Sequence, residues 1–225
     1  MYKRQAWQRA LSTTLHRTGI PYEALRNELL FGTALFVFVK SSLLPHIRRV
    51  EGTTKKTGFR GMSGNKGAVA VRFELFDASI CMVGSHLSSG SNNKEERNAD
   101  YHAIARDLVF TRGRTIDSHD HIFWAGDLNY RIALPSAEDV RDLASRRQLE
   151  PLLLHDQLTD VRMSNQAFAG YDEMPIRFPP TYKFDVGSDI YDTSEKLRPP
   201  AWTDRVLFKC TRPTLHIHPI AYDCA

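Results

Sequence analysis

The chain has 225 residues, 42% of them hydrophobic, which is enough to bury the core of a single domain. Its formal net charge of +4 is mixed along the sequence, so it suits an anionic ligand or membrane surface and does not by itself indicate nucleic-acid binding. The 3 cysteines are scattered, fit neither a disulfide framework nor a zinc site, and favour a reducing, cytoplasmic compartment. The longest apolar run, residues 34–39, is too short to cross a bilayer.

The N-terminal segment has the spacing of an amphipathic helix. Trp7, Leu11 and Leu15 recur at intervals of four residues, and this period places them on one helical face. We therefore expect a helix over residues 4–17 whose apolar face packs in the core.

Two strands and a short helix are expected next. Residues 22–30 and 33–40 are predicted to pair as strands around the two-residue turn between them. Residues 42–49 have a weaker pattern and are expected to form a short helix or turn, with Leu43 and Leu44 packing inward.

Residues 51–66 are rich in glycine and basic side chains, and they predict a phosphate-binding loop. Such a loop can present backbone N–H groups and ammonium ions to a phosphate. A solvated basic loop is the alternative. The basic residues are Lys55, Lys56, Arg60 and Lys66. The alternation of residues 68–76 then predicts a half-buried strand.

A second apolar run, residues 79–84, predicts a buried strand that delivers His86 at its end. The polar residues 88–93 are expected to form a loop that supplies the N-cap of a helix over 93–110. The side chains expected to face the core are Ala99, Ala103, Ile104 and Leu108.

Residues 122–125 predict the central buried strand, and polar side chains follow it directly. Asp127, Asn129 and Arg131 occupy alternate positions. On an extended backbone such side chains point the same way, so these three are expected to share one face. Gly126 would let a phosphate or metal approach the backbone. A strand followed by an ordinary polar turn is the alternative.

The same arrangement recurs, because Asp204 precedes a third apolar strand, residues 206–208. His86, Asp127 and Asp204 therefore lie at the ends of three predicted strands. With the amide of Asn129, they provide the groups that metal-assisted phosphoryl hydrolysis requires.

Predicted strands alternate with predicted helices, including one that starts at Ser136 with Asp139 in capping-box spacing. This alternation indicates a layered α/β sandwich with mixed strand directions. In the last third, the proline-braced residues 178–184 carry Lys183, and Lys196 and Arg198 precede two further prolines. Cations held by a rigid backbone can clamp a second phosphate, and ordinary surface charge is the alternative.

Six segments, in this order and spacing, resemble the catalytic domain of the inositol polyphosphate 5-phosphatases. They are GNKGAVAVRF, SHLSSG, ERNADY, FWAGDLNYRI, FPPTYKFD and SEKLRPPAWTDRVLF. The resemblance covers almost the whole chain from about Leu29, and SHLSSG together with Thr203 favours the synaptojanin-like branch. It implies an α/β fold, a four-layer α/β/β/α sandwich of the deoxyribonuclease-like phosphatase type, as one partial domain over residues 1–225 that is incomplete at both termini.

The resemblance also implies an enzyme, a phosphoric monoester hydrolase that uses Mg²⁺ to remove the 5-phosphate of phosphatidylinositol 4,5-bisphosphate and related inositol phosphates. Asp127 would orient or deprotonate the attacking water, and Asn129 would hold a phosphoryl oxygen. His86 would stabilise charge on the phosphate, and Asp204 would orient a histidine from elsewhere in the domain.

Substrate contacts are implied in the same way. Asn65 and Lys66 are expected near the substrate. The ring phosphate next to the one removed is expected to contact Tyr182, Lys183, Lys196 and Arg198. The expected partners are phosphoinositide lipids or soluble inositol phosphates and an anionic membrane surface, at which a cytoplasmic protein would bind peripherally, and no nucleic acid.

The family pattern has two parts that this sequence does not contain: a strand ending in Gln-Glu, whose glutamate binds the metal, and a Ser-Asp-His near the C-terminus. We therefore expect a chain truncated at both ends, with its metal ligands unknown and little activity alone. Two alternatives remain. One is a nuclease of the same fold, against which FPPTYKFD, Lys196 and Arg198 argue; the other is a catalytically silent phosphoinositide-binding module.

Overall fold

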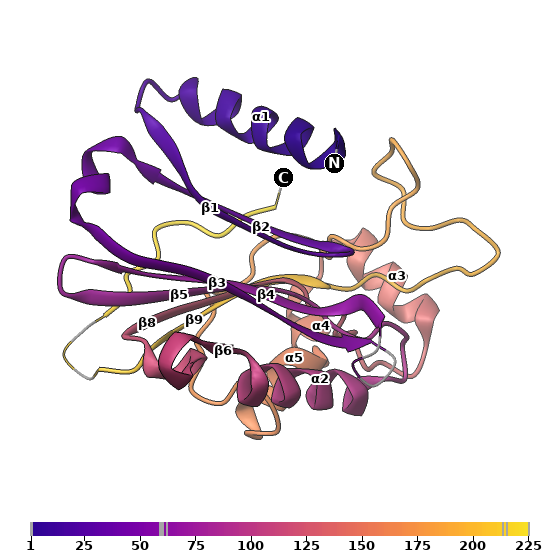
Figure 1. Cartoon of the computed structure of the whole chain (residues 1–225). Coiled ribbons are helices and arrows are strands. Elements are labelled where there is room, and N and C mark those ends of the chain that lie inside the picture. Colours follow the sequence, from indigo (N-terminus) through magenta and orange to yellow (C-terminus); the bar gives the residue numbers. More distant parts are fainter. Residues whose placement is uncertain (1, 59–60, 62, 213, 215, 225) are drawn as a thin grey trace.

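The computed structural model describes residues 2–58, 61, 63–212, 214 and 216–224. Figure 1 shows a helix, a two-stranded sheet, a five-stranded sheet and a layer of helices stacked in that order. The outer helix and small sheet are α1 (Tyr2–His16), β1 (Tyr22–Leu30) and β2 (Thr33–Lys40). The central sheet contains β3 (Ile47–Gly58), β4 (Ser63–Leu75), β5 (Ala78–His86), β8 (His121–Asp127) and β9 (Asp204–Cys210). The expected four-layer α/β sandwich is confirmed.

The remaining helices lie below the central sheet and at one end of it (Figure 1). They are α2 (Lys94–Asp107), α3 (Ala137–Ser145), α4 (Leu149–Leu154) and α5 (Gln157–Met163). Shorter elements connect the layers: η1 (Ser41–His46), β6 (Val109–Phe110), η2 (Thr111–Gly113), β7 (Arg114–Thr115) and η3 (Ile116–Ser118). The predicted N-cap of α3 is confirmed, because the Ser136 hydroxyl accepts a hydrogen bond from the Asp139 N–H.

Strand directions in the central sheet are mixed, as expected. The order is β3-β4-β5-β8-β9, and every neighbouring pair is antiparallel except β5 and β8. The parallel pair is joined by the α2 crossover, since two parallel strands cannot be linked by a tight hairpin. β9 therefore runs opposite to β5 and β8.

β4 is buried on both faces, and the expected half-buried strand is wrong. Val71 and Phe73 pack against Val37 of the small sheet. Ala68 and Ala70 belong to the cluster on the helical side of the sheet. The helical layer covers the Ala68 and Ala70 face, which an alternating pattern assigns to solvent.

The glycine-rich stretch 51–66 is largely a strand hairpin, so the expected loop is also wrong. Lys55 pairs opposite Ala68, and Lys56 pairs opposite Gly67. The glycines permit close packing: a Cβ on Gly67, at φ +141°, would lie 2.1 Å from the Lys55 carbonyl oxygen. Arg60 lies outside the described residues.

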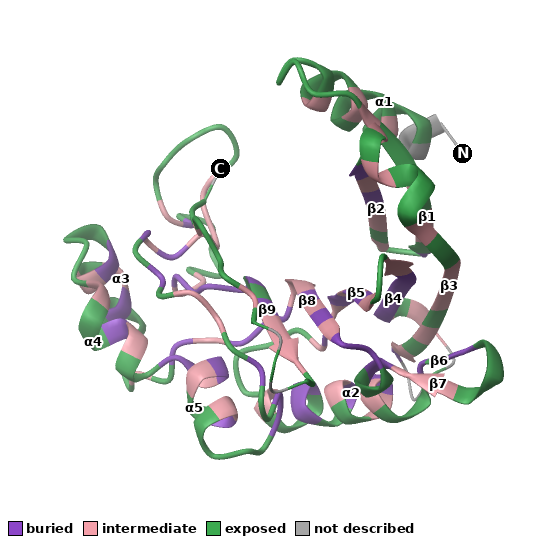
Figure 2. Ribbon diagram, turned by 90° about the vertical axis from the view of Figure 1, so that its left-hand side faces the viewer, coloured by how far each residue is buried: buried purple, intermediate pink, exposed green. Residues whose placement is uncertain are grey.

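Two N-terminal expectations about packing are also wrong. Trp7 is 64% exposed, and Figure 2 shows α1 largely exposed along its length. Only one side of the small sheet packs on the central sheet, and α1 lies on the other. Leu44 is exposed too, and η1 contains no buried residue. The predicted pairing of β1 with β2 is confirmed.

Helix α2 differs from its prediction in its end and in its buried face. It ends at Asp107, because β6 begins at Val109. Ile104 and Leu108 are buried as expected, whereas Ala99 is exposed and Ala103 only half-buried. The other buried positions are polar: Arg97, Asn98 and Asp100.

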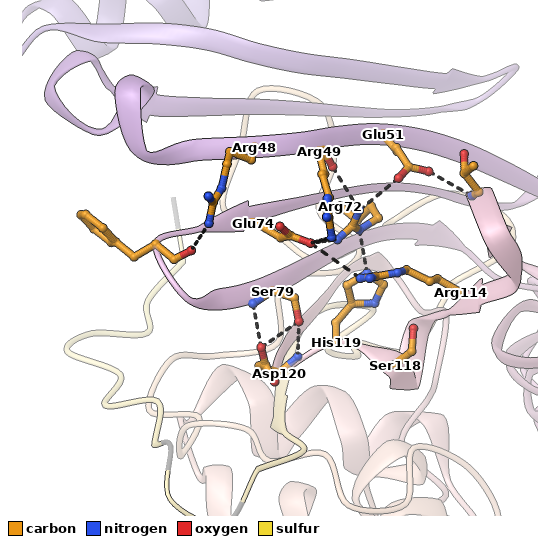
Figure 3. Close-up of polar contacts among 12 residues, drawn as sticks. Arg48, Arg49, Glu51, Arg72, Glu74, Ser79, Arg114, Ser118, His119 and Asp120 are labelled. Carbon is orange, nitrogen blue, oxygen red and sulfur yellow. Dashed lines mark hydrogen bonds and ion pairs between the residues drawn. The ribbon is translucent and has the colours of Figure 1, made fainter.

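A buried polar cluster connects strands β3 and β4 of the central sheet to the segment that precedes β8 (Figure 3). Arg72 is 1% exposed, and its Nε donates to His119 Nε2 at 3.0 Å. Its other nitrogens donate to Glu51 at 3.0 Å and to Glu74 at 3.2 Å. Every nitrogen of this guanidinium has a partner, so the cluster has a structural role. Within the described part of the chain, no helix is both long and apolar enough to span a membrane.

Candidate active site

Three of the predicted catalytic residues form one row across the central sheet. His86 is the register partner of Asp127 in the β5–β8 pair, and Asp127 is the partner of Asp204 in the β8–β9 pair. Because β9 runs the opposite way, its first residue lies at the same sheet edge as the last residues of β5 and β8. The side chains meet: His86 Nε2 is 3.3 Å from Asp127 Oδ2.

Lys66 adds a cation to this row. Its Nζ contacts His86 Nε2, and Gly67 beside it is the register partner of His86. Burial lowers the pKa of Lys66, with Asp127 opposing this shift. Burial and the Lys66 ammonium lower the pKa of His86. A neutral His86 that accepts a hydrogen bond from Lys66 is therefore the state expected at neutral pH.

Two carboxylates occupy neighbouring positions in the row. Burial raises the pKa of Asp127 to about 6, and the negative charge of Asp204 acts in the same direction. Asp204 is exposed, and its Oδ2 accepts a hydrogen bond from the Thr203 hydroxyl at 2.9 Å. Lys66 and Arg131 oppose the rise in the pKa of Asp127, so the edge carries both signs of charge close together.

Asn129 and Arg131 reach the row through a turn, so the expected extended arrangement is wrong. β8 ends at Asp127, and Asn129 has a left-handed backbone with φ 58°. The Asn129 N–H donates to Asp127 Oδ1 at 3.1 Å, and Arg131 donates to Asn129 Oδ1 at 2.6 Å. Asn129 Nδ2 donates to the Leu87 carbonyl at 3.0 Å, which fixes the amide on both sides.

Gly126 serves packing within the sheet. Its φ is +126°, and a Cβ here would lie 2.2 Å from the Ser85 carbonyl oxygen on β5. The close approach that requires glycine is therefore between β8 and β5, and not toward a phosphate or metal as expected.

Two of the four predicted ring-phosphate residues, Lys183 and Arg198, contact Asp192, which sequence reasoning missed. This carboxylate is fully buried and accepts from the Arg198 N–H at 2.9 Å and from the Ser194 N–H at 3.3 Å. Lys183 Nζ lies 3.4 Å from it. Its place before Thr193 and Ser194 is typical of a turn, and that was the available signal. Lys196 is exposed and apart from this group.

A cavity of about 630 Å³ lies beside the turn that carries Asn129. Arg131 connects this turn to the cavity, because its guanidinium carbon lies 4.4 Å from the centroid of the Tyr182 ring, which lines the cavity. The lining includes Arg131, Tyr182, Arg198 and the loop residues Ser89, Gly90, Ser91 and Asn92. A second cavity, of about 970 Å³, lies between the β3–β4 hairpin and α2 and includes Asn65 and Lys66. Lys55 there is paired with Asp107 at 2.8 Å.

Comparisons with known proteins find one matching family and several similar proteins. Residues 1–225 match the model of Endonuclease/Exonuclease/phosphatase family 2. The chain is 49% identical over 210 residues to inositol-1,4,5-trisphosphate 5-phosphatase 1 of Schizosaccharomyces pombe, which covers 92% of this chain and 19% of that protein. It is 46% identical over 203 residues to human synaptojanin-1, which covers 90% of this chain and 13% of that protein.

Among solved structures, the inositol polyphosphate 5-phosphatase domain of SPsynaptojanin, in complex with inositol (1,4)-bisphosphate and a calcium ion, aligns with a TM-score of 0.88. Its sequence identity is 47%, and the alignment covers 93% of this chain and 62% of that chain. The chain therefore spans less than two thirds of that domain and a small part of the two curated relatives.

Proposed function

The chain belongs to Endonuclease/Exonuclease/phosphatase family 2 and is homologous to the synaptojanin-type inositol polyphosphate 5-phosphatase domains. From this premise we propose that it hydrolyses the 5-phosphate of phosphatidylinositol 4,5-bisphosphate and related inositol phosphates. The observation that carries the proposal is the row of His86, Asp127 and Asp204, with Lys66 beside it, at one sheet edge. The SPsynaptojanin domain binds inositol (1,4)-bisphosphate, which is what remains of inositol 1,4,5-trisphosphate after loss of its 5-phosphate. Residues 1–225 would form one part of a single domain of this kind.

In this proposal Asp127 orients and deprotonates the attacking water. Its pKa of about 6 lies close to neutral pH, which suits a general base. Asn129 holds a phosphoryl oxygen with the Nδ2 proton that does not bond to Leu87. The two bonds that fix the amide hold this proton in place before substrate arrives, so no reorganisation is needed.

Lys66 and His86 divide the role that the resemblance assigns to His86 alone. A neutral His86 that accepts from Lys66 holds the ammonium near Asp127. The ammonium then supplies the positive charge that stabilises the developing negative charge on the phosphoryl oxygens. Asp204, which is exposed and next to Asp127, remains available to orient another group of the domain.

Mg²⁺ is the cation we propose, and the side chains present fit it in part. Asp204 is a hard oxygen donor beside Asp127. Burial, and then the negative charge of Asp204, raises the pKa of Asp127, and a cation relieves the part that is due to repulsion. No group of three or more His, Cys, Asp or Glu side chains is arranged to hold a metal among the described residues. Mg²⁺ commonly takes one or two carboxylates and completes its shell with water and substrate phosphate. When bound, it would neutralise phosphate charge.

Tyr182, Lys183, Lys196 and Arg198 are proposed to contact the adjacent ring phosphate. The convergence of Lys183 and Arg198 on Asp192 and the place of Tyr182 and Arg198 in the 630 Å³ cavity support this role. Lys196 is exposed and would act on the approaching ligand or on the anionic surface of a cytoplasmic membrane leaflet, where we propose peripheral contact. Nucleic acid is not a proposed partner.

Phosphate release measures this function directly. Because residues 1–225 cover 62% of the SPsynaptojanin chain, we expect little release from them alone. A longer chain that also carries the strand ending in Gln-Glu and the Ser-Asp-His should release phosphate from inositol 1,4,5-trisphosphate and from vesicles containing phosphatidylinositol 4,5-bisphosphate, with Mg²⁺ and not with EDTA. Inositol (1,4)-bisphosphate, which lacks the 5-phosphate, is the matched control and should release none. Binding of both inositol phosphates without release would assign a silent binding module, and cleavage of duplex DNA would assign a nuclease.

A further inference from the structure

Arg97 is a buried arginine that makes no ion pair within the described residues, and the mechanism proposed above does not use it. It lies on α2 with 0% of its surface exposed. Its guanidinium donates to three neutral acceptors: the Gly90 carbonyl at 2.7 Å, the Ser88 carbonyl at 3.4 Å and Gln157 Oε1 at 2.7 Å. A buried cation is normally paired with a carboxylate, so this one requires an explanation.

The charge is retained in spite of burial. Desolvation, followed by the nearby Arg131, lowers the pKa of Arg97 to about 10, so the group stays protonated at neutral pH. The Tyr130 ring, 5.3 Å from the guanidinium carbon, gives partial compensation. Glu96 and Asp127 favour the charged form only from a distance. An anion bound nearby would supply the missing counter-charge.

Helix α2 holds the Ser88–Gly90 loop, which follows His86, by hydrogen bonds with two of its residues, Arg97 and Asp100. Asp100 Oδ2 accepts from the Ser88 N–H at 2.8 Å and from the Ser88 hydroxyl at 2.7 Å. The Arg97 guanidinium donates hydrogen bonds to the carbonyl oxygens of Ser88 and Gly90. One helix therefore fixes both the N–H and the carbonyl side of the loop.

This grip determines the direction of two peptide N–H groups. The only cis peptide in the described residues is Tyr182–Lys183, so the peptides after Ser88 and Gly90 are trans. In a trans peptide the N–H points opposite to the carbonyl. The N–H groups of Ser89 and Ser91 therefore point away from Arg97, and they donate to no acceptor within the described part of the chain. Both residues line the 630 Å³ cavity.

A second branch connects Arg97 to the turn of Asn129. Gln157 Oε1 accepts from Arg97 and also from the Arg131 N–H, at 3.0 Å. Arg131 in turn donates to Asn129 Oδ1. A single side-chain carbonyl thus links the buried cation to the amide proposed to hold a phosphoryl oxygen.

We propose that Arg97 is a positioning residue for an inositol phosphate bound in the 630 Å³ cavity. It holds the Ser88–Gly90 loop so that the Ser89 and Ser91 N–H groups face the anion, and it supplies positive charge from beneath the loop. Free backbone N–H groups that line one concave site can bind anions. The inference rests on the proposed function and adds a residue to it.

Calorimetric titration of the chain with inositol (1,4)-bisphosphate tests the charge. Arg97→Gln should weaken binding about ten- to a hundredfold, because charge-assisted hydrogen bonds are lost. The affinity of Arg97→Lys should lie between those of the wild type and Arg97→Gln, since lysine keeps the charge but lacks the several N–H donors of the guanidinium. Arg146→Gln is the matched control, an exposed arginine at the C-cap of α3 that is paired with Asp142, and should bind as the wild type. Unfolding temperatures verify that the variants are folded.

Amide NMR of the wild-type chain tests the loop without any variant. Saturation with the bisphosphate should shift the Ser89 and Ser91 amide signals more than that of Ser118, which lies in η3. Binding by the wild type with no shift at these amides, or equal affinity of a folded Arg97→Gln variant, would overturn the inference alone. A wild-type chain that binds no inositol phosphate would overturn the proposed function with it.

Discussion

Asp127 lies directly opposite Asp204 in the antiparallel β8–β9 ladder, and the two carboxylates stand beside each other at one edge of the central sheet. Like charges at opposed positions of neighbouring strands are destabilising. Here the repulsion contributes to the raised pKa of Asp127. Strain of this kind is found where a site is prepared for a ligand, and it is consistent with a site that receives a cation and a phosphate.

Replacing Asp127 tests the proposed general base. In the longer chain with the strand ending in Gln-Glu and the Ser-Asp-His, Asp127→Asn keeps the shape of the side chain but cannot accept a proton, so turnover should fall by about 10²- to 10⁴-fold. Affinity for inositol (1,4)-bisphosphate should change little. Initial rates and calorimetry measure the two effects, with Asp142→Asn on the exposed face of α3 as a control. A rate within a few-fold of wild type would assign proton transfer to another group.

The ring-phosphate contacts are tested by substrate choice. Lys183→Ala and Arg198→Ala should each lower kcat/KM by about tenfold or more for substrates with a 4-phosphate, since charge-assisted contacts contribute about 1.5–3 kcal/mol. Substrates without a 4-phosphate should barely respond. The control is Arg112→Ala, at an exposed position in η2. Equal losses on both substrates would mean that these cations serve folding, chemistry or general attraction to membranes.

Asp192 should stabilise its segment in a pH-dependent manner. Hydrogen bonds from the Arg198 N–H and then from Ser194 hold the pKa of Asp192 below its usual value. A depressed pKa stabilises the fold above the unfolded value of about 3.9, and the contribution is lost as the pH falls through the folded value. Asp192→Asn should therefore unfold at a lower temperature than wild type between pH 5 and 8, by a constant margin. We expect this margin to shrink below about pH 4 in thermal scans. A margin independent of pH would exclude ionisation as its cause.

The buried arginine of β9 should dominate the stability of the connection between sheet and helices. Arg205 is 2% exposed and lies 2.9 Å from Asp156 and 2.7 Å from Glu173. Arg205→Met would leave the buried Asp156 without an ion-pair partner and Glu173 with Arg162 alone, at a cost of about 3–5 kcal/mol in the free energy of unfolding. Urea denaturation measures this cost. Arg146→Met removes an exposed ion pair and should change the free energy of unfolding by less than about 1 kcal/mol.

How far the sequence predicted this molecule depended on the kind of signal. Apolar runs that end in polar residues predicted β5, β8 and β9 and the residues that form the row, because a run of this type has few other structures open to it. The hairpin of β3 and β4 was mistaken for a loop because its glycines serve close strand packing. The sequence around a glycine does not show which strand packs against it.

Buried polar residues were the main omission. Arg97, Asp100 and Asp192 are charged, so periodicity assigns them to the surface, yet all three are buried and hold loops of the site. Their burial depends on backbone groups supplied by distant segments, such as the Gly90 carbonyl for Arg97. The spacing of Arg97 and Asp100 within ERNADY was visible in the sequence, but its partners were not.

The row of paired strand residues has a consequence for how this chain can diverge. The relative positions of His86, Asp127 and Asp204 are set by hydrogen bonding between strands, whereas residues 178–200, which carry the proposed ring-phosphate residues, form an excursion that contains no strand of the sheet. Lengthening or replacing this excursion does not alter strand register, so ring recognition can be remodelled while the reacting groups stay in place. A single residue inserted within β9 would instead turn the following side chains to the opposite face. The residues that recognise the ring can therefore change in sequence more readily than the residues that carry out the reaction.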